Sequence, residues 1–254
     1  SEMAVATLKY GQNILAETNS YELVISDKKD LSGLPNELIE TAAADAKSKG
    51  KAGKWVFTLS NSSVIPFVQY SSNRKLRQEI WNAYQMRANN GNDKDNKSLA
   101  IKIANLRGEK ARLLGYATHA DYVLEKSMAK NPETANKLLN DLWIPALNMA
   151  NKEAADIQKM MQKEGINEPV QPYDWRYYTE KIRKERFDLD EQEMKPYFSL
   201  EKTREGVFTV CKNLYGLQFK QLNNVPKYHE DVTVWEVTEA NGSHVGILYM
   251  DFHP

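Results

Sequence analysis

Hydrophobic residues recur at helical spacing over most of the chain. The clearest case follows Asn131, where an N-cap residue, a first-turn proline and an acid lead into apolar positions three and four residues apart, up to Gly165. Pro145 lies inside this pattern, and we expect it to kink one long helix rather than divide it. Similar patterns with capping signals predict further helices, and together they should hold over half of all residues. These helices cover 4–16, 35–49, 73–88, 95–114, a short segment from Thr118, 175–187 and 200–214.

Strand patterns are fewer. Residues 55–59 form a short run of β-branched and aromatic residues. Near the end, 232–238 and 244–252 flank Asn241-Gly242, and Asn-Gly is the strongest short signal for a β-hairpin. The sequence therefore predicts a mostly α protein, with a helical array over 1–225 and a small C-terminal β-hairpin over 226–254.

The last strand ends in an unusual way. Its apolar run from Gly246 to Phe252 stops two residues before the end of the chain, with no polar tail. Such a strand leaves an apolar edge unless something pairs with it. We expect that the chain is a piece cut from a longer protein, and the alternative is a partner that covers the strand. Self-association through this strand is expected in the first case.

Composition narrows the class of protein. The 254 residues contain 34 Lys plus Arg and 34 Asp plus Glu, so the formal net charge is zero. No basic field therefore draws the chain to nucleic acid or to a membrane surface. The longest apolar runs fall far short of the roughly 20 residues that span a bilayer. No signal-peptide pattern is found at the start, and a cytoplasmic and a periplasmic location both remain open.

The residues that carry chemistry do not form a recognisable site. The histidines are His119, His229, His244 and His253, and none belongs to a His-Glu-x-x-His pair that would bind zinc from one helix face. Cys211, the one cysteine, lies in an apolar run and is expected to be a buried, inert thiol. Glycine-rich phosphate loops and activated-serine motifs are also missing. We therefore assign no catalytic residue and no metal ligand within the chain, and the substrate-binding residues stay unknown.

An aromatic cluster at 173–178 is the densest in the sequence. Trp175 and Tyr178, three residues apart, are expected to face the core while Asp174 caps the helix. The alternative is that one tyrosine of the cluster lines a substrate cleft with its polar tip exposed. Acid–base pairs such as Glu109 with Arg112 and Glu180 with Lys184 have helix-face spacing and are read as solvated ion pairs.

The same cluster opens a series of blocks that resembles the zinc oligopeptidases related to thimet oligopeptidase. The segment from Tyr173 to Lys181 is similar to the family's Trp-Asp-x-x-Tyr-Tyr-x-Glu-Lys block, although Tyr173 stands where tryptophan is commoner. Further blocks follow in the family's order, at 195–200, 205–208, 214–219 and 228–237, and upstream at 11–15, 31–35 and 111–116. The block at 228–237 resembles the bacterial peptidyl-dipeptidase branch, also called dipeptidyl carboxypeptidase.

The resemblance implies a function for the parent protein. It implies a two-lobed, α-helical zinc peptidase whose deep cleft admits short unfolded peptides and which releases C-terminal dipeptides. In this family two histidines and a glutamate hold zinc and a second glutamate activates water, and all of them lie beyond the strand on which this chain ends. The chain alone is therefore expected to bind no zinc and to be inactive. An endo-acting oligopeptidase of the same family and a non-catalytic helical scaffold or peptide-binding module are the alternatives.

Overall fold

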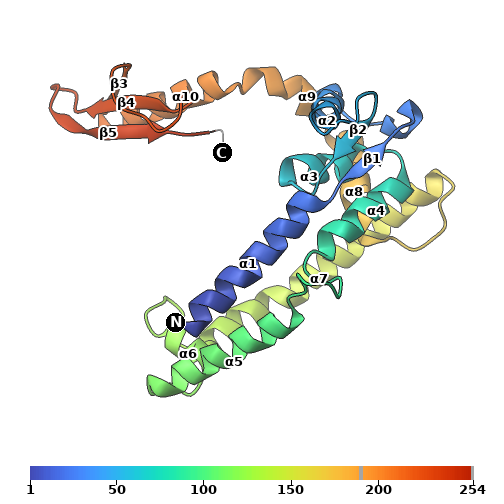
Figure 1. Cartoon of the computed structure of the whole chain (residues 1–254), viewed down its shortest axis with the longest axis horizontal. Coiled ribbons are helices and arrows are strands. Elements are labelled where there is room, and N and C mark those ends of the chain that lie inside the picture. Colours follow the sequence, from blue (N-terminus) through green and yellow to red (C-terminus); the bar gives the residue numbers. More distant parts are fainter. Residues whose placement is uncertain (189–190, 253–254) are drawn as a thin grey trace. The chain divides into compact units, whose positions relative to one another are not determined.

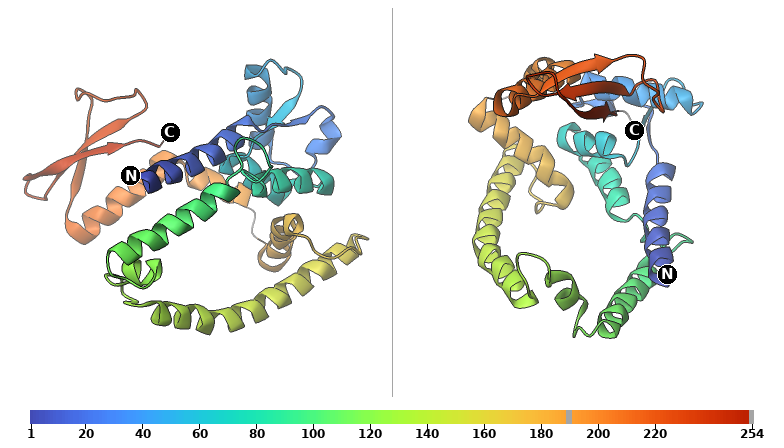
Figure 2. Two further views of the ribbon diagram at one scale, coloured as in Figure 1. Left: turned by 60° about the horizontal axis from the view of Figure 1, so that its bottom comes forward. Right: turned by 90° about the vertical axis from the view of Figure 1, so that its left-hand side faces the viewer.

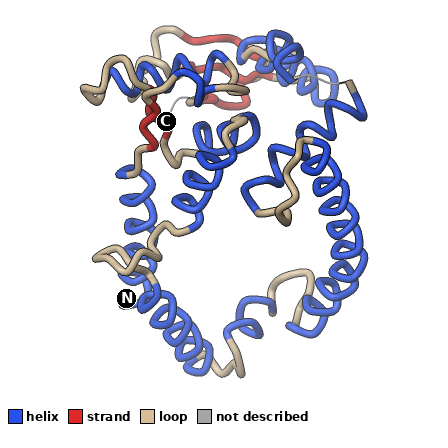
Figure 3. The backbone as a smooth tube through the Cα atoms, turned by 90° about the vertical axis from the view of Figure 1, so that its right-hand side faces the viewer, coloured by secondary structure: helices blue, strands red, loops and turns tan. Residues whose placement is uncertain are grey.

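The computed structural model describes residues 1–188 and 191–252, and the chain divides into two compact units, residues 1–188 and 189–254. Figure 1 labels the elements of both units. More than half of the described residues are helical (Figure 3), which confirms the mostly α prediction. None of the described helices is both long enough and apolar enough to cross a membrane.

The first unit is built from helices with one small sheet. Its helices are α1 (Glu2–Ser20), α2 (Asn36–Ser48), α3 (Asn61–Tyr70), α4 (Arg74–Gln85), α5 (Lys97–Leu113), α6 (His119–Leu124), α7 (Pro132–Lys163) and α8 (Pro172–Phe187), with a short 3₁₀ turn η1 at Lys28–Leu31. The expected helices are all present, and most boundaries agree with the prediction within two residues.

Capping residues explain several of these boundaries. The Asn131 side chain accepts a hydrogen bond from the Thr134 amide at 2.8 Å, which satisfies an amide that the first turn of α7 leaves open. Thr118 and Asp121 form the predicted capping box at the start of α6. α7 runs through Pro145 as one helix, as expected, and is the long yellow-green helix of Figures 1 and 2.

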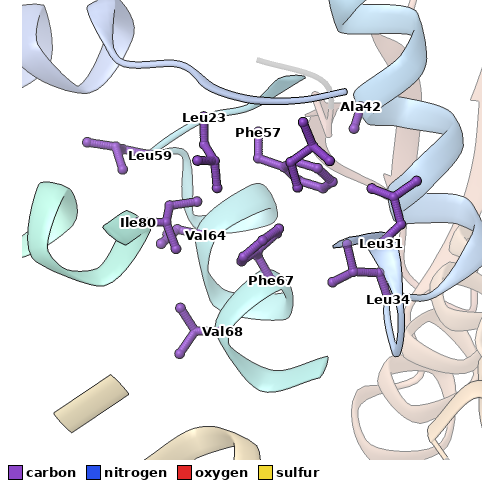
Figure 4. Packing of buried hydrophobic residues seen from close by; sticks show 11 residues of the cluster. Leu23, Leu31, Leu34, Ala42, Phe57, Leu59, Val64, Phe67, Val68 and Ile80 are labelled. Carbon is purple, nitrogen blue, oxygen red and sulfur yellow. The ribbon is translucent and has the colours of Figure 1, made fainter. Parts of the chain in front are cut away.

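The main core of the first unit lies around a two-stranded antiparallel sheet. β1 (Leu23–Ile25) pairs with β2 (Trp55–Phe57), with Leu23 opposite Phe57. Figure 4 shows apolar side chains from this sheet, η1, α2, α3 and α4 meeting in one cluster. The rings of Phe57 and Phe67 make an edge contact with centroids 4.7 Å apart, a geometry that aromatic pairs favour.

One helix of this core was not predicted. α3 contains Pro66 and begins with a run of serines, so both its proline and its weak helix formers argue against a helix by pattern alone. Its apolar residues Val64, Phe67 and Val68 are nevertheless buried. Burial of that face compensates for the poor local propensity, because tertiary packing outweighs propensity in most protein helices.

Polar side chains fix α1 to the loop before α5. The buried Asn13 donates to the side chain of Asn96 at 2.9 Å, and Asn96 in turn donates to the Tyr10 carbonyl at 2.9 Å. The Glu17 carboxylate accepts hydrogen bonds from the Ala88 amide and from two asparagine side chains of the loop. These bonds satisfy groups that would be costly to bury unpaired, and α1 packs along α5.

The second unit contains a three-stranded antiparallel sheet. Its elements are α9 (Glu191–Met194), a 3₁₀ turn η2 (Lys195–Tyr197), α10 (Leu200–Tyr215), β3 (Gln218–Leu222), β4 (Thr233–Thr238) and β5 (His244–Met250). The hairpin of β4 and β5 is the predicted one, and the Gly242 φ of 86° shows why its turn favours glycine. β3 was not predicted, and it gives the sheet the order β3-β4-β5.

Helix α10 packs against this sheet through Phe208. The Phe208 ring stacks on Phe219 of β3 with centroids 4.1 Å apart and meets Trp235 of β4 edge-on at 4.9 Å. The sequence grouped α10 with the helical region and began the hairpin region at residue 226. In the structure the second unit begins at residue 189 and includes α10, because this aromatic contact joins the helix to the sheet.

Candidate functional site

The described histidines lie on separate elements. His119 opens α6, and its buried Nδ1 has no hydrogen-bond partner within residues 1–188 and 191–252. His229 accepts a hydrogen bond from the Asp231 amide at 3.3 Å, and His244 Nδ1 lies 3.2 Å from Glu236 Oε1 across the hairpin. His253 lies outside the described residues. Within the described part of the chain, no three His, Cys, Asp or Glu side chains are grouped so as to hold a metal ion.

The Cys211 thiol is on α10. It is half-buried rather than fully buried, so the expected burial was overstated. Phe208 is the residue of α10 that is buried against the sheet, and the other positions of this helix, Cys211 included, keep part of their surface exposed.

The aromatic cluster forms the first turns of α8. Tyr178 is buried, as expected, and its hydroxyl donates to Glu164 at 3.1 Å. Trp175 packs against the core of Ile157, Met161 and Tyr178, as expected, and is half-buried there, whereas Tyr173 is fully buried. The reason is that the first turn of α8 packs against α4, which covers Tyr173, while Trp175 turns towards α7.

Asp174 has a larger role than helix capping. Its carboxylate accepts a hydrogen bond from the Gln171 amide at 3.1 Å, which is the expected capping contact. It also accepts two hydrogen bonds from Arg74, at 2.8 and 3.0 Å, and one from Arg77 at 3.1 Å. Asp174 is fully buried and Arg77 is 1% exposed, so this ion cluster joins the start of α4 to the start of α8 inside the protein.

Within this ion cluster, Arg77 makes further contacts that compensate for its burial. Arg77 donates to the carbonyls of Ser71 at 2.8 Å and Tyr173 at 3.3 Å, and its guanidinium lies over the Tyr177 ring at 4.0 Å. Burial alone would raise the pKa of the Asp174 carboxyl, but the hydrogen bonds from Arg74 and the Gln171 amide outweigh it. The pKa of Asp174 therefore lies below its usual value, and the carboxylate stays ionised at neutral pH.

A groove runs between α7 and α8 on the surface of the first unit. It has a volume of about 240 Å³. Apolar side chains from both helices contribute to it, and charged side chains border them. The lining residues are Glu153, Asp156, Ile157, Trp175, Thr179, Ile182, Arg183, Arg186 and Phe187. The groove thus combines an apolar surface with charges of both signs, the composition of a site for a small amphipathic ligand.

The groove and the ion cluster share α8 but rest on different faces of it. Sequence reasoning singled out Trp175 and Asp174 but did not connect Asp174 to Arg74 and Arg77, which lie about a hundred residues upstream. The signal that could have found them is the pair of arginines at i and i+3 on α4, a helix of strongly amphipathic pattern. Glu180, expected to pair with Lys184, forms an ion pair with Arg183 at 2.7 Å and accepts a hydrogen bond from Gln69.

The first half of α7 exposes a large apolar surface. Leu142, Trp143 and Ile144 are each exposed by more than half, and their apolar neighbours along the helix are also exposed. The other members of this surface are Leu138, Leu139, Leu147 and Met149. Soluble proteins seldom expose apolar patches of this extent without a partner.

Comparisons with known proteins give matches that together cover nearly the whole chain. A model of the family described as Peptidase family M3 matches residues 67–254. Dipeptidyl carboxypeptidase of Escherichia coli (strain K12) is 34% identical over 253 residues, which cover 99% of this chain and 37% of that protein. Oligopeptidase A of Salmonella typhimurium is 32% identical over 249 residues, covering 96% of this chain and 36% of that protein. The organellar oligopeptidase A of Arabidopsis thaliana is 32% identical over 98% of this chain and 32% of its own length. The chain thus spans about a third of the length of these curated relatives.

Proposed function

Because the chain belongs to peptidase family M3, we propose that the whole protein is a peptidase that removes dipeptides from the C-termini of oligopeptides. One observation supports the finer assignment. Dipeptidyl carboxypeptidase of Escherichia coli matches 99% of this chain at 34% identity, and the matched residues make up 37% of that protein. The substrates would be short, unfolded peptides.

Zinc is the metal that peptidases of this family use. The described residues of this chain do not fit a zinc site, because no group of three potential ligands is found among them. We propose that the zinc ligands and the glutamate that activates water belong to the remainder of the protein.

The chain would contribute a rigid helical wall. The buried ion cluster of Arg74, Arg77 and Asp174 joins α4 to α8, and α3 contacts α8 as well. These contacts link the core around β1 and β2 to the α7–α8 pair within one unit. A rigid wall of this kind lets a catalytic group on a neighbouring element keep its geometry.

The proposed removal of C-terminal dipeptides can be tested with two peptides that differ only in their C-terminal group. The whole protein, loaded with zinc, would be incubated with an N-acetylated peptide that ends in a free carboxylate and with the same peptide ending in an amide. We expect mass spectrometry to show successive loss of C-terminal dipeptides from the free acid, and cleavage of the amide to be at least tenfold slower. A peptidase that reads the C-terminal carboxylate loses that charge-assisted contact with the amide, at a cost of about 1.5–3 kcal/mol.

The outcome also separates the alternatives. Equal cleavage of both peptides at internal bonds would favour an endo-acting oligopeptidase, the second candidate, which the 32% identity to oligopeptidase A supports. No cleavage of either peptide by the zinc-loaded protein would leave a non-catalytic helical scaffold.

We also propose that the chain on its own self-associates through β5. Within the described sheet β5 pairs only with β4, so its other edge offers free backbone donors and acceptors. Val245, Ile247 and Tyr249 are exposed on one face of this strand. Light scattering should show a dimer that Ile247→Lys weakens, whereas a strict monomer at high concentration with fast amide exchange over 245–250 would contradict the proposal.

A further inference from the structure

We propose that the groove between α7 and α8 binds a peptide segment in which an aromatic or aliphatic side chain stands next to a basic residue. The inference rests on the proposed function for its choice of a peptide as the ligand. The groove itself is defined by the geometry of the first unit alone.

The apolar part of the groove comes from four side chains. Ile157 forms part of the buried contact between the helices, while Trp175 and Ile182 are half-buried beside it. Phe187, at the end of α8, is 72% exposed although it is a large aromatic residue. A volume of about 240 Å³ accepts one large side chain of a peptide but not a folded domain.

The charged border of the groove is unevenly paired. Arg186 forms an ion pair with Asp156 at 2.6 Å that crosses from α8 to α7, and Arg183 forms one with Glu180 at 2.7 Å. Both arginines that line the groove therefore already have carboxylate partners. The Glu153 carboxylate forms no hydrogen bond or ion pair with any described residue, and its side chain is exposed.

Because, among the described residues, both arginines of the groove are paired and Glu153 is not, the groove favours a ligand with a positive charge. A cation placed beside the apolar surface would meet the free carboxylate of Glu153, whereas an anion would have to compete with Asp156 or Glu180 for an arginine. A lysine or arginine next to an aromatic residue supplies both the apolar body and the cation. The arrangement selects a basic–apolar peptide over an acidic one.

Nuclear magnetic resonance of the purified chain can test this without any catalysis. The probes are three peptides with blocked termini, acetyl-Ala-Phe-Lys-Ala-amide, acetyl-Ala-Phe-Glu-Ala-amide and acetyl-Ala-Ala-Lys-Ala-amide. The readout is the indole N–H resonance of Trp175, one of five tryptophans, assigned by its loss in Trp175→Phe.

We expect the Phe-Lys peptide to shift the Trp175 resonance in a saturable way and to leave the other indole resonances in place. The Ala-Lys peptide should bind at least tenfold more weakly, because it buries no large apolar side chain. Glu153→Gln should weaken the Phe-Lys peptide by about threefold, the size expected for an exposed ion pair. Glu133→Gln, an exposed acid on the same helix outside the groove, is the matched control and should change nothing.

Three results would overturn the inference. These are no shift of Trp175, equal binding of the Phe-Lys and Phe-Glu peptides, and equal behaviour of Glu153→Gln and Glu133→Gln. Because binding is measured on a chain from which no activity is required, a negative result leaves the peptidase assignment untouched. Failure of the cleavage experiment would likewise leave the binding result standing.

Discussion

The core around β1 and β2 and the first half of α7 begin from the same kind of sequence but reach opposite environments. Helix α4, which contributes Ile80 to this core, and helix α7 both present apolar residues at helical spacing after an asparagine cap. Ile80 on α4 is 0% exposed, whereas Leu142 on α7 is 58% exposed. The pattern thus predicts the helix in both places, but it does not tell which helix finds a partner within these residues.

The second half of α7 makes the contrast sharper. Ile157 and Met161 of the same helix are buried against Tyr178 of α8. A single helix therefore changes from exposed to buried along its length, and the change occurs where α8 begins to cover it. Helical periodicity belongs to the sequence, and burial depends on the neighbour.

The largest expected effect comes from emptying the core. Phe67→Ala should lower the free energy of unfolding by about 3–5 kcal/mol, because it removes a fully buried ring and leaves a cavity beside Phe57. The measurement is urea unfolding followed by circular dichroism. Leu142→Ala is the control on α7 and should change stability by at most about 0.5 kcal/mol. Similar losses for both variants would mean that the two regions do not differ.

The next effect compares a buried and an exposed acid. Asp174→Asn should cost about 3 kcal/mol or more, because Arg77 would then be buried without a carboxylate. Asp156→Asn removes the exposed ion pair with Arg186 and should cost about 1 kcal/mol or less. Both variants are measured by the same urea unfolding. Equal losses of unfolding free energy in the two variants would show that water reaches the Asp174 ion cluster more easily than its burial indicates.

A smaller effect concerns alkaline pH. Burial, together with the nearby Glu79, raises the pKa of Tyr21 from its ordinary value of 10.0 to about 12. Because the folded chain holds the phenol proton more tightly than the unfolded chain, the stability from this group is complete below pH 10 and is lost as pH rises towards 12. Unfolding curves collected across this range should show that Tyr21→Phe falls less steeply than the wild type. If the stability of both proteins falls equally steeply with pH, groups other than Tyr21 cause the loss of stability at alkaline pH.

Much of the fold could be predicted from local signals. Asn131, Thr118 and Gly216 marked helix ends correctly because capping is a local interaction, and Asn241-Gly242 marked the hairpin for the same reason. The misses are long-range. β3 is stabilised by pairing with β4 and by the Phe208 ring, and neither leaves a periodic trace within its five residues.

The candidate site shows the same limit. The aromatic cluster at 173–178 was recognised, but its key contact joins Asp174 to arginines on α4, and only the folded chain brings them together. Trp175 packs against the same core as Tyr178, as their spacing on one helix face predicted. The groove in which Trp175 is only half-buried could not be predicted, because it results from the relative position of α7 and α8.

Zinc stoichiometry is the measurement that bears most directly on the division of roles between this chain and the remainder of the protein. The purified chain would be dialysed against zinc and then against metal-free buffer, and its metal content measured by elemental analysis. We predict far less than one zinc per chain and no cleavage of the acetylated peptide by the same sample. One tightly held zinc per chain, with cleavage that a chelator abolishes, would contradict the assignment of the zinc chemistry to residues outside this chain.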